Sequence, residues 1–145
     1  MGRVHPDRSI IKSLKGAEKS FVAVLADGLS DSWFIFTRQD LWDQSRPYEI
    51  DVLLMHEKYG FLSLEVKGGP VRIENGEWYR RTEHFPTSPV RQAQDAAYEL
   101  RNYLRENSTS FRNVQIPHAV VLPDVLSLKG DLPPSCTEEM LILNP

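Results

Sequence analysis

Residues 49–56 read EIDVLLMH and residues 61–67 read FLSLEVK, and these two apolar runs decide the fold of the chain. Both are rich in residues that suit a pleated, half-buried surface. Between them, Glu57-Lys58-Tyr59-Gly60 supplies a polar break that contains a glycine. The pattern therefore predicts two strands joined as a hairpin. Charged residues interrupt both runs, which an ordinary hairpin does not require.

The register of this hairpin decides whether its charged residues meet. Glu65 and Lys67 are two positions apart and so share one face of the second strand. Asp51 joins them if it lies opposite Glu65, which requires a three-residue loop over 57–59. Such loops are common, and Gly60 can take the positive φ that favours them. A two-residue loop would place Asp51 and Glu65 on opposite faces, so convergence depends on the loop length.

The length and composition of the chain limit its class. Its 145 residues are enough for one domain that buries about 68% of the surface exposed by the unfolded chain. A single cysteine, Cys136, excludes an internal disulfide and suits a reducing compartment. No apolar run approaches the roughly 20 residues of a membrane span, and the N-terminus lacks a signal-peptide core. We expect one soluble, cytoplasmic domain over residues 1–145, whose abrupt end suggests part of a longer protein.

Charge along the chain is uneven. The net charge of -3 argues against a strongly basic, non-specific binder of nucleic acid. Residues 1–19 and 67–91 nevertheless carry a local excess of basic residues, which a polyanion could meet. Solvated faces explain the same pattern equally well. The candidate contacts to a phosphate backbone are the side chains of Arg72, Arg80, Arg81, His84 and Arg91.

Two amphipathic helices flank the hairpin in sequence. Apolar residues recur at three- and four-residue steps from Ile10 to Leu25, which predicts a helix that ends at Gly28. Glu18 lies at the edge of its buried face. Ser88-Pro89 supplies a cap and a first-turn proline for a second helix that lasts to about Glu106.

The remaining apolar runs predict strands, at 33–37, 71–74, 77–80, 116–122 and 140–143. Asn75-Gly76 separates two of these runs and is a strong signal for a second hairpin. Residues 38–47 are polar and are expected to form a loop, and residues 84–87 an irregular connection. The order predicts an α/β fold, with a mixed sheet flanked by two helices.

Two carboxylates beside a lysine suit a hard divalent cation. Mg²⁺ prefers oxygen ligands and is held in proteins by one or two carboxylates together with substrate phosphates. Bound near a phosphodiester, it stabilises developing charge and lowers the pKa of a water molecule. An exposed ion pair on a sheet surface, which contributes little to stability, is the plain structural alternative.

Several motifs together resemble the nuclease-related domain, NERD, a branch of the PD-(D/E)xK nuclease superfamily. They run in order from Ile10 to Pro123, and they are Gly16-Ala17-Glu18, Glu49-Ile50-Asp51, Leu64-Glu65-Val66-Lys67-Gly68-Gly69, Gly76-Glu77-Trp78, Pro89-Val90-Arg91-Gln92-Ala93 and Val120-Val121-Leu122-Pro123. The resemblance implies a restriction-endonuclease-like mixed sheet with an α-β-β-β-α-β core, to which the second hairpin is an addition.

The resemblance also implies roles for single residues. Asp51, Glu65 and Glu18 match metal-binding carboxylates, and the backbone carbonyl of Val66 matches a further ligand. The two remaining catalytic positions are Lys67, which matches the catalytic lysine, and Gln92, which is expected to line the site or contact the phosphate. Glu49 stands where the superfamily's name places a proline, and we assign it no role.

The expected function is a Mg²⁺- or Mn²⁺-dependent nuclease domain that hydrolyses DNA. A catalytically inactive member of the same fold, which binds nucleic acid or a protein partner, is the alternative. Relatives occur fused to helicase and other domains, which suits either case. A plain α/β domain with a surface ion cluster is a third interpretation. The sequence does not determine the oligomeric state.

Overall fold

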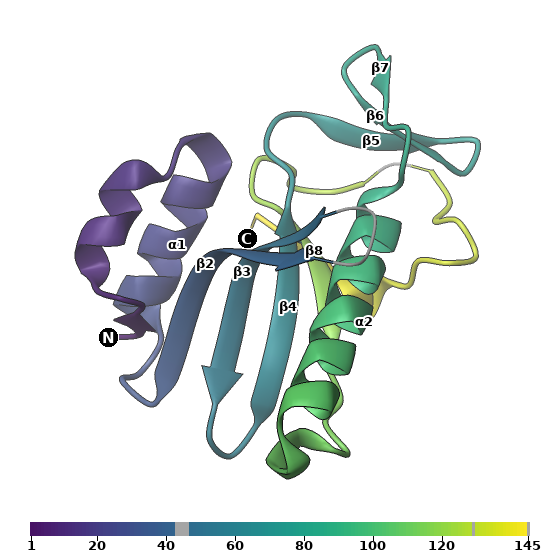
Figure 1. The fold of residues 1–145 in the computed structure, drawn as a ribbon. Coiled ribbons are helices and arrows are strands. Elements are labelled where there is room, and N and C mark those ends of the chain that lie inside the picture. Colours follow the sequence, from purple (N-terminus) through teal and green to yellow (C-terminus); the bar gives the residue numbers. More distant parts are fainter. Residues whose placement is uncertain (43–46, 129, 145) are drawn as a thin grey trace.

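The computed structural model describes residues 1–42, 47–128 and 130–144 (Figure 1). The predicted hairpin lies at the centre of a six-stranded sheet, as β3 (Pro47–His56) and β4 (Gly60–Val66). His56 lies opposite Gly60 and Val52 opposite Leu64, so the three-residue loop is confirmed. Gly60 has φ +87°, a conformation that glycine adopts without steric cost.

The strand before the hairpin is longer than predicted. β2 (Trp33–Trp42) pairs antiparallel with β3 along its whole length. The prediction of a loop over 38–47 was therefore wrong for 38–42 and for Pro47, which begins β3, while 43–46 lie outside the described residues. Polar residues are tolerated here because this part of the strand is largely exposed: Arg38 and Asp40 face solvent. Arg38 takes φ +46° within the strand.

Three further strands complete the six-stranded sheet, in the order β1-β2-β3-β4-β8-β9. β8 (His118–Leu122) lies parallel to β4, and β9 (Leu141–Leu143) lies parallel to β8. Both were predicted, within two residues of their starts. The two-residue β1 (Arg3–Val4), parallel to β2, was not predicted, because so short a strand leaves no periodic pattern.

The first predicted helix is divided into two. A 3₁₀ helix, η1 (Arg8–Ser13), precedes α1 (Gly16–Gly28), so the prediction of one helix from Ile10 was wrong. Gly16, with φ +56°, lies where the chain changes direction between the two. The apolar residues of the predicted helix still pack in one core, because buried Leu14 and Val22 lie in the same cluster as Val52 of the sheet.

The second helix, α2 (Pro89–Asn107), begins as predicted. The Ser88 hydroxyl accepts a hydrogen bond from the Arg91 N–H over 3.1 Å, which caps the first turn. The helix connects β4 to β8 and packs against Leu53 through Ala96 and Leu100. Leu53 and Val52 are adjacent on β3 and point to opposite faces. α1 and α2 therefore cover opposite faces of the sheet.

A small antiparallel sheet lies beyond the end of β4 and the N-terminus of α2 (Figure 1). It contains β5 (Val71–Glu74), β6 (Glu77–Arg80) and the short β7 (Glu83–His84), where an irregular connection was predicted. Asn75 and Gly76 both have positive φ, as their hairpin turn requires. Trp78 of β6 is buried, in a cluster with residues of α2 and β8. Two 3₁₀ helices, η2 (Thr109–Phe111) and η3 (Glu138–Met140), follow α2 and precede β9.

Within the described residues, every helix is too short or too polar to cross a membrane.

Candidate functional site

Asp51 and Glu65 form the centre of the candidate site. The register of β3 and β4 places them opposite each other, one position beyond the pair Val52 and Leu64. Both are buried, with 8% and 7% of their surface exposed. The Val66 N–H donates a hydrogen bond to Oδ2 of Asp51 over 2.8 Å. The sequence therefore buries two carboxylates side by side in a sheet, an arrangement that costs stability unless a cation or protons neutralise them.

Lys67 completes the group on the face that strand alternation predicts. Its ammonium nitrogen lies 3.1 Å from Oε1 of Glu65. Its backbone N–H donates to the Val121 carbonyl over 2.9 Å, which continues the pairing of β4 with β8. The side chain of Lys67 is only 18% exposed and that of Glu65 9%, so this ion pair is screened much less than a surface pair.

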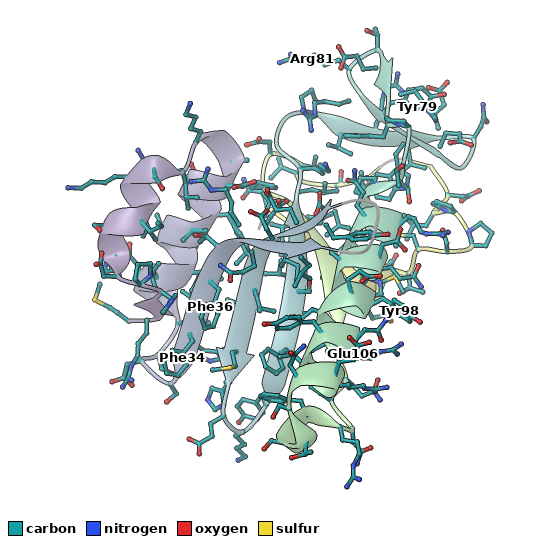
Figure 2. All side chains as sticks on the ribbon, in the orientation of Figure 1. Phe34, Phe36, Tyr79, Arg81, Tyr98 and Glu106 are labelled. Carbon is teal, nitrogen blue, oxygen red and sulfur yellow. The ribbon has the colours of Figure 1, made fainter. Side chains whose placement is uncertain are left out.

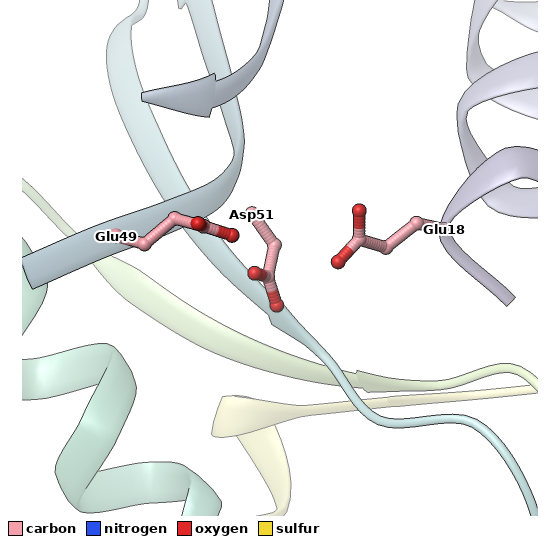
Figure 3. A group of neighbouring side chains, drawn as sticks. All are labelled: Glu18, Glu49 and Asp51. Atoms are coloured by element: carbon pink, nitrogen blue, oxygen red, sulfur yellow. The ribbon is translucent and has the colours of Figure 1, made fainter. Parts of the chain in front are cut away.

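Two glutamates from different elements approach Asp51. Glu18 lies in the first turn of α1, and Glu49 precedes Asp51 by two residues on β3. One carboxylate oxygen from each of the three residues lies within 4.8 Å of the others. Figure 3 shows Glu18 and Glu49 pointing toward Asp51 from opposite sides. The interpretation that gave Glu49 no role overlooked that Glu49 and Asp51 share a strand face.

Gly68 allows α1 to approach the end of β4. A Cβ atom at this position would lie 2.7 Å from the Cβ of Ala17, closer than two carbon atoms can pack. Ala17 is the neighbour of Glu18, so the absence of a side chain at Gly68 lets the first turn of α1 reach the carboxylates of the sheet.

The electrostatics reflect the crowding of acidic groups. Burial, and then the charge of Asp51, raise the pKa of Glu65 to about 7. Burial also raises the pKa of Asp51, although the hydrogen bond from Val66 opposes this. The pKa of Glu18 is raised by burial and by the charge of Glu49, and that of Glu49 by burial and by the charge of Asp51. The four carboxyl groups hold protons more strongly than free side chains do, so the site favours a positive partner.

A cavity of about 360 Å³ opens beside these carboxylates and is lined by Tyr48, Glu49, Asp51, Glu65, Thr87, Gln92, Asp95 and Ala96. Gln92 reaches it from α2. The Oε1 atom of Gln92 is buried and accepts no hydrogen bond, which is unusual for a buried polar atom. A ligand or water in the cavity would supply the missing donor.

The five predicted phosphate contacts are in different environments. Arg72 pairs with Glu74 over 2.8 Å, Arg91 with Asp95 over 3.1 Å, and His84 with Glu77 over 2.9 Å. Arg81 lies at the outer end of the small sheet (Figure 2). Arg80 alone of the five lies over Phe85, a ring that Lys67 also contacts.

Arg38 is a residue near the site that the sequence did not indicate. Its Nη2 donates to the carbonyl and to the hydroxyl of Ser13, over 3.2 and 3.1 Å. Its positive charge lowers the pKa of both Glu18 and Glu49, against the effects of burial. Arg38 was missed because a loop was predicted at this position, whereas Arg38 lies in β2, between the pairs Thr37–Val52 and Gln39–Ile50.

Comparison with known proteins bears directly on this arrangement. No curated protein matches the chain, and no solved structure matches it. The nuclease-related domain matches residues 13–123, a range that contains both α-helices and the strands β2 to β8. The mixed sheet flanked by helices agrees with a restriction-endonuclease-like fold, as the resemblance implied. The chain therefore belongs to the nuclease-related domain family, NERD, in the general context of the PD-(D/E)xK superfamily.

Proposed function

We propose that this domain hydrolyses phosphodiester bonds of DNA and that it requires Mg²⁺ or Mn²⁺. The observation that carries the proposal is the buried pair of Asp51 and Glu65, with Lys67 3.1 Å from Glu65. A structural ion pair would not need a second buried carboxylate or a cavity beside it. Family membership and the adjoining cavity support the same reaction.

The donor set fits a hard divalent cation. Carboxylate oxygens of Glu18 on α1 and of Glu49 and Asp51 on β3 lie within 4.8 Å of one another, and oxygen is the ligand that Mg²⁺ prefers. Burial raises the pKa values of Asp51 and Glu65 although Lys67 lowers both, so a bound cation would stabilise their charged forms further. We propose Asp51, Glu65, Glu18 and the backbone carbonyl of Val66 as the ligands, with Glu49 as an additional carboxylate. Bound there, the ion would withdraw charge from the phosphodiester and acidify a water molecule.

The side chains of the domain have separate roles in this proposal. Lys67 holds Glu65 with one of its three N–H donors, which leaves donors for a phosphate oxygen on which negative charge develops. Gln92, with its unpaired Oε1 in the cavity, accepts a hydrogen bond from the attacking water and orients it. The water oxygen bonds to phosphorus, the bond to the leaving oxygen breaks, and that oxygen takes up a proton.

A cleavage assay tests the proposal. Purified protein is incubated with end-labelled single- and double-stranded DNA, in Mg²⁺, in Mn²⁺ and in EDTA. The variants are Asp51→Asn and Lys67→Ala, and the control is Lys58→Ala. Lys58 lies in the loop at the other end of the same hairpin, and among the described residues it interacts with the Tyr59 ring and with its own turn.

We expect cleavage in either metal by the wild type and the Lys58 variant, and none in EDTA or with the two site variants. Equal background cleavage by all four proteins would contradict the proposal. Salt-sensitive DNA binding without cleavage would indicate a binding module of the same fold instead.

A further inference from the structure

We propose that Arg80 forms a subsite for a second phosphate of the DNA strand, next to the phosphate at Lys67 that is cleaved. This inference rests on the proposed function for the identity of its ligand. The ammonium of Lys67 lies 5.6 Å, and the guanidinium of Arg80 5.3 Å, from the centre of the Phe85 ring. The two cations are therefore no more than about 11 Å apart, a span that two phosphates of one strand can occupy.

Arg80 is brought to the site by the backbone that follows Lys67. It ends β6 and pairs with Val71, the first residue of β5. Its Cδ lies 3.4 Å from the position that a Cβ of Gly69 would occupy, and Gly69 has φ +82°. The stem of the arginine thus packs on the turn that leaves β4, two residues beyond Lys67.

The guanidinium of Arg80 lacks an anionic partner within the described part of the chain. Its Nε is buried without a hydrogen bond, and it takes part in no ion pair there. Burying such a donor unpaired is unfavourable. By contrast, the predicted phosphate contacts Arg72 and Arg91 are already paired with acidic neighbours.

The guanidinium of Arg80 is suited to bind a phosphate. A guanidinium presents several donors in a fixed plane that matches a phosphate or a carboxylate. Phe85 binds the cation through its ring face and holds it without neutralising it. Lys67 is partly neutralised by Glu65, whereas Arg80 has no ion pair with any described residue. A strand whose phosphates extend from Lys67 toward the small sheet would supply the anion.

The test measures DNA binding in EDTA, so that it does not depend on cleavage. The probe is a fluorescein-labelled single-stranded 20-mer, titrated at several salt concentrations. The variants are Arg80→Gln and Arg80→Lys. The matched control is Arg3→Gln, because Arg3 also lies over a ring, Phe34, at 5.4 Å. Phe34 is at the opposite end of the molecule from the small sheet (Figure 2).

We expect Arg80→Gln to weaken binding about tenfold and to reduce the dependence of log K on log salt by about one counterion. Arg80→Lys should keep the salt dependence and recover part of the affinity, and Arg3→Gln should match the wild type. Equal affinity and salt dependence for the wild type and Arg80→Gln would overturn the inference, as would absence of measurable DNA binding by the wild type.

The two proposals fail separately. If the wild type cleaves DNA and Arg80→Gln leaves both the binding and KM unchanged, the subsite is wrong and the proposed function stands. If no protein cleaves but Arg80→Gln still loses affinity and one counterion, the subsite is supported and the proposed catalysis fails. Thermal unfolding of each variant, with a transition like that of the wild type, shows that lost binding is not lost folding.

Discussion

The backbone N–H of Val66 and the carboxylate of Asp51 are joined by a 2.8 Å hydrogen bond across the central hairpin. The bond uses one oxygen of Asp51, and the carboxyl groups of Glu18 and Glu49 hydrogen-bond with the same side chain. Because the donor belongs to the backbone of β4, the carboxylate is positioned by the fold itself. Asp51 is therefore pre-organised before any cation or substrate binds, which is the condition for efficient electrostatic catalysis.

Two substitutions of Asp51 distinguish the role of its charge from the role of its hydrogen bond with Val66. Asp51→Asn keeps a carbonyl oxygen that can accept from Val66, whereas Asp51→Ala leaves that buried N–H unpaired. We expect both variants to lose cleavage, and the alanine variant to be less stable than the asparagine variant by about 1–3 kcal/mol. Urea unfolding in EDTA at pH 8 measures the difference. Equal stability of the two variants would contradict a structural role for the bond.

Glu65 makes stability depend on pH in the direction opposite to that of an ordinary salt-bridged acid. Its pKa is about 7 in the folded protein, above the usual 4.5, so the folded state binds its proton more tightly than the unfolded state does. Stability is then greatest below about pH 4.5 as far as this group is concerned, and it falls as the pH rises toward 7. The loss is on the order of 3 kcal/mol.

Glu65→Gln should remove that loss. We expect the metal-free variant to be more stable than the wild type at pH 8, and its stability to change less between pH 5 and pH 8. Urea unfolding at these pH values is the measurement, and Glu106→Gln is the control. Glu106 is exposed at the end of α2 (Figure 2). A Glu65→Gln variant that is less stable than the wild type at pH 8 would show that Lys67 compensates the charge fully.

The central hairpin and its site could be predicted because their signals are local. The glycine after a polar break set the register that brings Asp51 and Glu65 together, and Asn75-Gly76 and Ser88-Pro89 marked a turn and a helix start. Each of these features depends on the backbone preferences of one or two residues. The family resemblance then added Glu18 and Gln92, which lie on helices that strand alternation cannot reach.

The features that were missed depend on contacts between distant segments. The extension of β2 beyond Thr37 requires β3 as its partner, and the polar sequence of 38–42 gives no sign of it. Arg38 was overlooked for this reason, although its charge acts on Glu18 and Glu49. Glu49 lies in the predicted hairpin and was given no role because a proline was expected at its position. The break between η1 and α1 was hidden because Ile10 and Leu14 keep the helical spacing while the chain changes direction at Gly16.

Gly68 links the packing of α1 to the geometry of the site. A methyl group at Gly68 would meet Ala17 at 2.7 Å, so Gly68→Ala should displace the first turn of α1 and Glu18 with it. We expect a destabilisation of about 1–3 kcal/mol and weaker activation by Mn²⁺, measured as the metal concentration that gives half-maximal cleavage.

Gly28→Ala is the matched control for Gly68, since Gly28 ends α1 and, its chain neighbours and the helix backbone aside, no atom stands within 4 Å of its Cβ position. Its stability should remain within about 0.5 kcal/mol of the wild type, and its metal dependence should not change. If Gly68→Ala needs no more metal than Gly28→Ala does, Glu18 is not coupled to the site through this contact.

Gln92 offers a test in which function and stability change in opposite directions. Its buried Oε1 has no donor, so Gln92→Leu removes an unsatisfied polar atom and should leave the free energy of unfolding unchanged or raise it. The same substitution removes the group that we propose to orient the attacking water, and cleavage should fall by about 10- to 100-fold. Gln94→Leu, two residues further along α2 and exposed, should keep full activity. A Gln92→Leu variant that loses activity and stability together would indicate that Gln92 supports the packing of α2, because a side chain that serves only the reaction contributes nothing to folding.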